Sequence, residues 1–190
     1  MGFWATLTGR VKPRPAILDP LIALSAACDA IATGVAFTPT GLGSVCVRAI
    51  EDRVFRDKQH DVCNWLNRDT EAMAVEISED SYGFTWMVIH RPADRFESLV
   101  ADIHAASMKF ANGGFGPQLL CSVVNFEDRD GRCLGIVYLY SRGTFYPFAP
   151  RPEETRDNDL ELRIKDVINE RLPLEPELKR WLAVWGAPGL

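Results

Sequence analysis

Apolar side chains recur every three or four positions in several stretches of the chain, which is the spacing of a helix buried along one side. The predicted helices cover residues 20–33, 52–67, 92–110, 158–172 and 176–184. The first has the clearest boundaries, because Asp19 stands at its N-cap position, Pro20 at its first helical position and Gly34 after its last residue.

β-rich runs lie between these helices. The predicted strands cover residues 44–49, 73–78, 83–90, 119–126, 133–140 and 144–148. Asp130 and Gly131 form a strong hairpin signal between two of them, whereas the glycine-rich residues 41–43 predict a turn before the first. Strand 83–90 is apolar on both faces, so we expect an inner strand that is covered on both sides.

The order of these elements groups strands into hairpins instead of alternating strand and helix. It favours an α+β fold, an antiparallel sheet flanked by helices, over a parallel Rossmann-like sheet. The 190 residues suit a single domain and contain no internal repeat. Residues 1–14, with three basic and no acidic side chains, are expected to form a basic N-terminal arm.

The net charge and the hydropathy of the chain exclude some classes of binding partner. The chain has 21 basic and 26 acidic residues, and a net charge of −5 disfavours nucleic acid. No apolar window is long enough to span a membrane, and the N-terminus lacks the charge order of a signal peptide, so we expect a cytoplasmic protein. Within the basic arm, Phe3 and Trp4 are the candidates for membrane contact, at most peripheral and at the inner membrane face.

The chemistry-bearing residues form no recognisable catalytic or metal-binding pattern. The glycines of residues 41–43 precede a strand instead of following one, and no nucleophile stands in a GxSxG turn. The histidines lack the spacing of a metal site, and no pair of cysteines is spaced as CxxC, so reduced buried thiols are expected. We therefore expect a protein that is not an enzyme and needs no cofactor. The five cysteines to which the expectation of reduced thiols applies are Cys28, Cys46, Cys63, Cys121 and Cys133.

Aromatic residues concentrate in residues 138–150 and near the C-terminus. Tyr146 and Phe148 flank a proline at which the chain is expected to leave the sheet, so we predict an exposed aromatic shelf there. Trp181 and Trp185, one helical turn apart in sequence, either extend this partner-binding surface or pack on the domain.

A second interpretation places a small-molecule site or an enzyme pocket beside the sheet. Arg142 stands among aromatic residues and would anchor an anion, with Tyr140 and His90 nearby. The competing interpretation of Arg142 is a turn residue.

Long segments of the sequence are similar to a known bacterial and archaeal family. These are the opening MGF with its basic stretch, SYGFTW (residues 81–86), GFGPQLLCSVVNF (114–126), YLYSRGTFYPFAP (138–150) and VWGAPGL (184–190). Together they resemble the PspA-associated protein PspAB family over nearly the whole chain, and least over residues 28–67.

The resemblance implies a role in the phage-shock response, in which the coiled-coil protein PspA protects a stressed inner membrane. It implies an accessory protein that binds PspA or a related envelope-stress protein. The order of elements also resembles the YbjN and type III secretion chaperone sandwich, whose members bind partners and often form homodimers.

Overall fold

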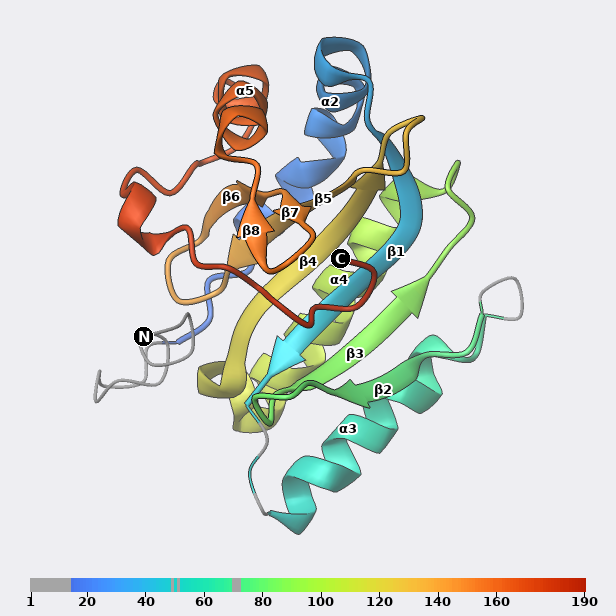
Figure 1. The fold of residues 1–190 in the computed structure, drawn as a ribbon. Coiled ribbons are helices and arrows are strands. Elements are labelled where there is room, and N and C mark those ends of the chain that lie inside the picture. The colour runs from blue at the N-terminus through green and yellow to red at the C-terminus, as the bar shows by residue number, and fades with distance from the viewer. Residues whose placement is uncertain (1–14, 49, 51, 70–72) are drawn as a thin grey trace.

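The computed structural model describes residues 15–48, 50, 52–69 and 73–190. Its main feature is a 6-stranded antiparallel sheet with the order β2-β3-β1-β4-β5-β6 (Figure 1). The strands are β1 (Thr38–Val47), β2 (Glu76–Glu79), β3 (Thr85–His90), β4 (Leu119–Glu127), β5 (Cys133–Leu139) and β6 (Thr144–Phe148). β7 (Pro150–Arg151) and β8 (Thr155–Arg156) form a separate small hairpin. The predicted α+β fold with an antiparallel sheet is confirmed.

Helices cover one face and both ends of the sheet. The α-helices are α2 (Cys28–Val35), α3 (Arg53–Leu66), α4 (Phe96–Phe110) and α5 (Asn158–Ile168). Shorter helical turns are η1 (Asp19–Ala27), η2 (Ala111–Phe115), η3 (Gly116–Gln118) and η4 (Leu178–Arg180). Figure 1 shows α4 behind the sheet, α2 and α5 together at one end, and α3 beside β2 at the other.

The face behind the sheet is closed by α4, whose apolar side chains join the larger of two hydrophobic clusters. Gly43 on β1 permits this close contact, because a Cβ at that position would lie 2.6 Å from Cδ1 of Ile103 on the helix. Burial of this interface is the main source of the favourable folding free energy on this side.

The opposite face is also apolar, but none of the α-helices in the described residues covers it. Trp86, Tyr146 and Phe148 lie there, fully buried, in a second cluster. They are covered by residues 173–190, which we call the C-terminal segment and which contribute Trp181 and Val184. Figure 1 shows this segment, in red, crossing in front of the sheet.

The first predicted helix differs from the structure. η1 is a 3-10 helix that continues into α2, Asp19 lies inside it, and its N-cap is Leu18, which forms no side-chain cap. The buried positions Leu18, Leu21 and Leu24 are three apart, which matches the 3-residue turn of a 3-10 helix. The helix also passes through Gly34, because it is Ala36 that adopts the left-handed conformation at its end.

The turn predicted for residues 41–43 is wrong, since these residues lie within β1. The register of β1 against β4 shifts between Pro39 and Gly43, so the glycines form a bulge. Gly41 has a φ of +80°, and a Cβ there would lie 2.0 Å from the carbonyl oxygen of Arg91, so the bulge requires glycine.

The helix predicted for residues 176–184 is also wrong, because only η4 is helical there. The chain pairs with β6 just before it: the N–H of Phe145 donates to the carbonyl of Pro173 at 2.9 Å, and that of Glu175 to the carbonyl of Phe145 at 2.8 Å. The indole N–H of Trp181 donates to the carbonyl of Glu175 at 2.9 Å. With these contacts in place the segment forms only η4 and turns instead of the predicted helix, and Trp181 and Trp185 do not share a helix.

Three other elements begin later or end earlier than predicted. α4 begins at Phe96 instead of residue 92, α5 ends at Ile168 instead of residue 172, and β2 begins at Glu76 instead of residue 73. Residues 1–14, with the expected basic arm and the membrane candidates Phe3 and Trp4, lie outside the described residues. The single domain and the likeness to the YbjN and secretion chaperone sandwich stay predictions.

Candidate functional site

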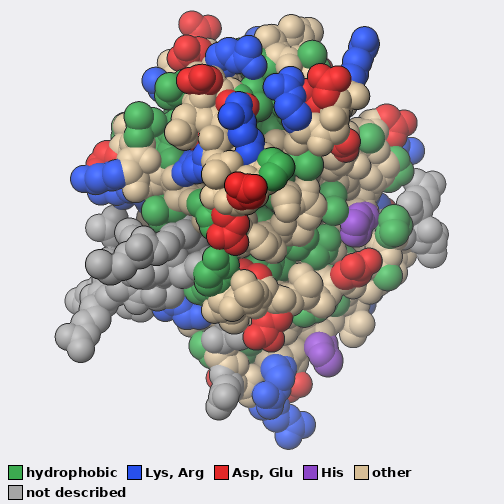
Figure 2. All heavy atoms as spheres, in the orientation of Figure 1, with side chains coloured by type: hydrophobic (Ala, Val, Ile, Leu, Met, Phe, Trp, Pro, Cys, Tyr) green, Lys and Arg blue, Asp and Glu red, His purple; other side chains and the backbone are tan. Residues whose placement is uncertain are grey.

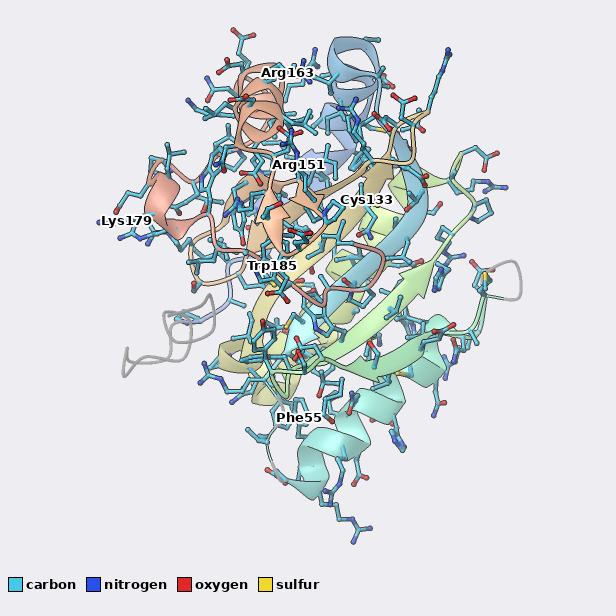
Figure 3. The ribbon with its side chains drawn as sticks, viewed as in Figure 1. Phe55, Cys133, Arg151, Arg163, Lys179 and Trp185 are labelled. Carbon is cyan, nitrogen blue, oxygen red and sulfur yellow. The ribbon has the colours of Figure 1, made fainter. Side chains whose placement is uncertain are left out.

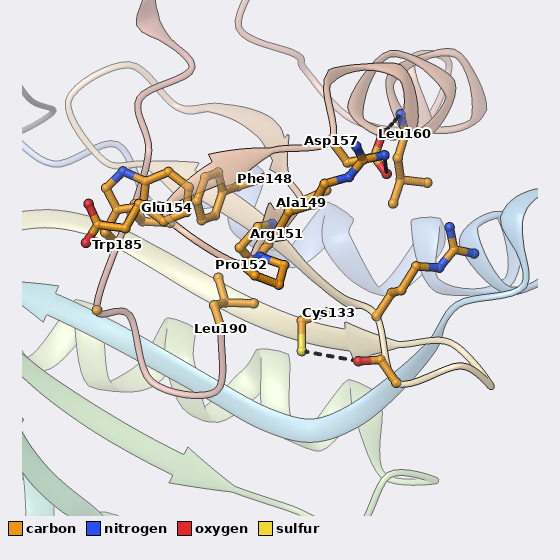
Figure 4. Close-up of a pocket in the computed structure, with 15 residues that line it drawn as sticks. Cys133, Phe148, Ala149, Arg151, Pro152, Glu154, Asp157, Leu160, Trp185 and Leu190 are labelled. Carbon is orange, nitrogen blue, oxygen red and sulfur yellow. Dashed lines mark hydrogen bonds and ion pairs between the residues drawn. The ribbon is translucent and has the colours of Figure 1, made fainter.

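A pocket of about 610 Å³ opens between the C-terminal segment, the β7–β8 hairpin and the beginning of β5. We call it the tail pocket (Figure 4). Phe148 and Ala149 belong to its apolar lining, Trp185 and Leu190 come from the C-terminal segment, and Pro152 comes from the hairpin. Figure 3 places Trp185, Arg151 and Cys133 on this side of the molecule and Phe55 at the far end.

The hairpin is held against α5 by Asp157, the N-cap of that helix. Its Oδ1 accepts the N–H of Leu160 at 3.0 Å, and its Oδ2 accepts a hydrogen bond from Arg151 Nη2 at 2.6 Å. Burial alone would raise the pKa of Asp157, but these two donors lower it below its usual value. The carboxylate therefore remains ionised and fixes the position of the Arg151 side chain.

The turn of the same hairpin has an unusual backbone. Glu153 and Glu154 both adopt positive φ angles, 62° and 51°, although neither is glycine. Such a conformation costs roughly 1–2 kcal/mol per residue for an L-amino acid. Thr155 Oγ1 closes the turn by donating to the carbonyl of Pro152 at 3.0 Å.

Basic and acidic side chains are interspersed on the face of the molecule that carries the C-terminal segment and the hairpin (Figure 2). At the pocket, Arg132 pairs with Asp128, with the Nη2 and Oδ2 atoms 2.6 Å apart, and Arg151 pairs with Asp157. Glu154 also lines the pocket and forms no hydrogen bond or ion pair with another described residue.

Cys133 is the thiol of the pocket, and its surroundings disfavour a nucleophile. Burial raises its pKa, and the nearby carboxylates of Glu127 and Asp128 raise it further. Because the thiolate is the reactive form, a raised pKa makes this cysteine less reactive. Across the described part of the chain, no group of three or more His, Cys, Asp or Glu side chains is arranged to hold a metal ion.

The four aromatic residues predicted to bind a partner do come together. Tyr146 stacks on Trp181 with ring centroids 6.2 Å apart, and Phe148 meets Trp185 edge-on at 4.9 Å. The Tyr146 hydroxyl donates to the carbonyl of Leu182 at 2.9 Å.

The exposed shelf predicted for Tyr146 and Phe148 is wrong, whereas Trp181 follows the alternative prediction and packs on the domain. Tyr146 and Phe148 are fully buried and Trp181 is 5% exposed, whereas Trp185 is partly exposed. The chain does not leave the sheet at Pro147, which pairs with Ile136 inside β6, so both flanking side chains point under the C-terminal segment.

The structure does not bring Arg142, Tyr140 and His90 into one site. Arg142 pairs with the buried carboxylate of Glu175, and the hydroxyl of Tyr140 lies 2.5 Å from Oγ of each of two buried serines, Ser107 and Ser122.

His90 lies at the other end of the sheet. It pairs with Leu42 on β1, whereas Tyr140 lies beside Leu120, at the end of the sheet where β3 begins. None of the three predicted residues lines the tail pocket, which touches only residues 148–150 of the aromatic segment.

The pocket residues Arg151, Pro152 and Glu154 were not predicted from sequence. Residues 151–158 form a polar stretch after the sheet, which is typical of solvent-exposed chain. The closely spaced prolines at 147, 150 and 152 were the available signal, since they imply a sharply turning segment.

The fold and the pocket define an α+β protein whose antiparallel sheet is closed on one face by helices and on the other by its own C-terminal segment. The model of the family described as PspAB, PspA associated protein B, matches residues 1–189, so the chain belongs to this family. This membership links the protein to the PspA system. No curated protein and no solved structure matched the chain. Among the described residues, no helix combines the length and the apolar character needed to cross a membrane.

Proposed function

We propose that this protein is a cytoplasmic, non-enzymatic accessory factor of the PspA envelope-stress response that acts by binding another protein. PspA, or a related envelope-stress protein, is the proposed partner. The observation that carries this proposal is the family match over residues 1–189.

The chemistry of the tail pocket supports binding more than catalysis. Its two arginines are engaged by carboxylates of the same chain, and its thiol has a raised pKa. A pocket with an apolar lining and a partly exposed tryptophan at its rim is typical of a site that receives a side chain of another protein.

The buried aromatic residues have a supporting role in this proposal. Tyr146, Phe148 and Trp181 form a rigid base, and Phe148 contacts the Trp185 ring edge-on. Trp185 is thereby held at the pocket with little freedom left to lose on binding, which favours affinity. Direct contact with the partner would then come from Trp185 and the pocket instead of from an exposed shelf.

The test is co-purification of the full chain with PspA from the same genome, with and without membrane stress. The native chain should bind, and Trp185→Ala should weaken binding by about tenfold or more, as expected for a central aromatic contact. Trp65→Ala is the matched control, because Trp65 is also partly exposed but lies on α3, at the far end of the molecule. Failure of the native chain to associate with PspA under stress would overturn the proposal.

The volume of the tail pocket favours a second candidate, a small-molecule-binding protein or enzyme. About 610 Å³ lies within the usual range for ligand pockets, roughly 300–1,000 Å³. A metabolite screen by thermal unfolding tests it, since a true ligand should raise the Tm of the native chain and not that of Trp185→Ala.

A homodimer and peripheral membrane contact through Phe3 and Trp4 remain proposals. Sedimentation tests the homodimer, and liposome flotation tests the membrane contact.

A further inference from the structure

The charged side chains that line the tail pocket differ in whether they already form an ion pair within this chain. Arg132 and Arg151 already hold carboxylates of this chain, at 2.6 Å each. Glu154 is exposed, lines the same pocket and bonds to no other described residue. The charge left without a partner is therefore negative. An anionic ligand would have to displace Asp128 or Asp157, whereas a cationic ligand meets Glu154 without breaking an existing pair.

An aromatic ring completes the site for a cation. Trp185 lines the pocket, and its ring is fixed edge-on against Phe148 at an interplanar angle of 71°. Glu154 lines the same pocket, and in the view of Figure 4 both it and Trp185 appear on the side opposite Asp157 and Leu160. The face of an indole attracts cations, and a carboxylate of the same pocket would add a separate attraction between opposite charges.

Glu154 stands in a turn with a strained backbone. Its left-handed conformation, with a φ of 51°, determines where its side chain begins, and it costs stability that glycine or asparagine would not. Glu153 has the same strain but does not line the pocket, so it serves as an internal comparison.

We propose, resting on the protein-binding function above, that this end of the tail pocket receives a lysine or arginine side chain of the partner. The aliphatic stem of that side chain would lie on the apolar lining near Trp185 and Leu190, and its charged head would meet the Glu154 carboxylate. The net charge of −5 favours approach of a cationic surface. The partner is thus a protein that presents an exposed basic side chain.

The first experiment uses a small cation and needs no partner. The full chain is titrated with n-butylammonium and, separately, with butyrate, while the indole N–H resonances are followed by NMR, with that of Trp185 assigned from Trp185→Phe. n-Butylammonium should shift the Trp185 resonance with saturation in the millimolar range, and butyrate should not. Glu154→Gln should weaken the apparent affinity about fivefold, the size of one solvent-exposed charge interaction. Glu153→Gln, which removes the same charge one residue away, should leave it unchanged.

Either of two results overturns the cation site: a Trp185 shift by butyrate at least as large as by n-butylammonium, or equal effects of Glu154→Gln and Glu153→Gln. The second experiment repeats the PspA co-purification with both variants. If PspA binds Glu154→Gln as well as the native chain, the inference fails and the proposed function stands. If n-butylammonium binds as expected but PspA binds none of the proteins, the proposed function fails and the cation site stands.

Discussion

The ion pair of Arg156 and Glu161 joins β8 and α5 to the C-terminal segment. Arg156 Nε and Nη2 lie 2.9 and 2.8 Å from the two carboxylate oxygens, and its Nη1 donates to the carbonyl of Trp181. Glu161 Oε1 also accepts the N–H of Ala149 at 2.9 Å. The side chain of Arg156 is only 20% exposed and that of Glu161 only 4%. We therefore expect loss of this ion pair to destabilise the packing of the C-terminal segment on the second sheet face.

Replacing Glu161 with alanine removes two interactions at once. Loss of one partner from a buried ion pair costs roughly 3–5 kcal/mol, because the other charge stays buried. The unpaired amide of Ala149 adds roughly 1–3 kcal/mol. Since Arg156 is partly exposed and keeps its bond to Trp181, we take the lower part of these ranges and expect a loss of about 4 kcal/mol. That is a large share of the roughly 5–15 kcal/mol stability of an ordinary domain.

Two further variants separate the contributions. Glu161→Gln keeps an oxygen for the amide of Ala149 but loses the charge, so it should cost less, about 2 kcal/mol. Burial raises the pKa of Glu161, and the hydrogen bonds from Arg156 and Ala149 offset this only in part, so the folded protein holds the ionised form at a cost. The double variant Arg156→Met with Glu161→Leu, which buries no charge, should therefore recover at least half of the loss.

The assay is urea denaturation followed by far-UV circular dichroism, with the free energy of unfolding taken from the midpoint and slope. Glu170→Ala is the control, because Glu170 is exposed just after the same helix and should change stability by no more than about 0.5 kcal/mol. A loss below about 1 kcal/mol for Glu161→Ala would refute the reasoning, since it would show that the carboxylate does not hold the segment in place.

Two other predictions concern buried polar groups. Tyr140→Phe removes the hydroxyl that joins the two buried serines, and it should lower the free energy of unfolding by about 1–2 kcal/mol in the same urea assay; an unchanged midpoint would contradict it. Because the pKa of Asp157 is lower in the folded protein than in the unfolded chain, its ionisation stabilises the fold above the ordinary carboxyl range and this contribution is lost as the pH falls below about 4. Thermal unfolding between about pH 5 and 3 should therefore depend less steeply on pH in Asp157→Asn, and an identical slope would count against the Asp157 bonds.

Features that depend on neighbouring residues were predictable. α3 begins where its sequence indicates, since the Asp52 side chain accepts the N–H of Val54 at 2.8 Å. The hairpin predicted from Asp130 and Gly131 joins β4 to β5, with Gly131 at a φ of +77°. Both signals work because a cap or a tight turn is formed within a few residues of chain.

The candidate site could be predicted only in part. Phe148 and Trp185 line the tail pocket, but Glu154 does so from a strained turn that no propensity indicates. Residues 148, 154 and 185 are far apart in sequence, so their meeting depends on where the C-terminal segment crosses the sheet. That path is set by long-range contacts such as the one between Trp181 and Tyr146.

The amino-acid sequence alone therefore determined the class of fold, the hairpin order and the family, because helix periodicity, turn residues and long motifs are local properties of the chain. Tertiary structure decided which aromatic residues are buried. Residues 176–184 have a helical pattern, yet pairing of the residues just before them with β6 and burial against an apolar sheet face outweigh helix propensity, so that only η4 is helical there. Tyr146 and Phe148, which we expected at the surface, lie in the second hydrophobic cluster. Trp185 lies at the rim of the tail pocket.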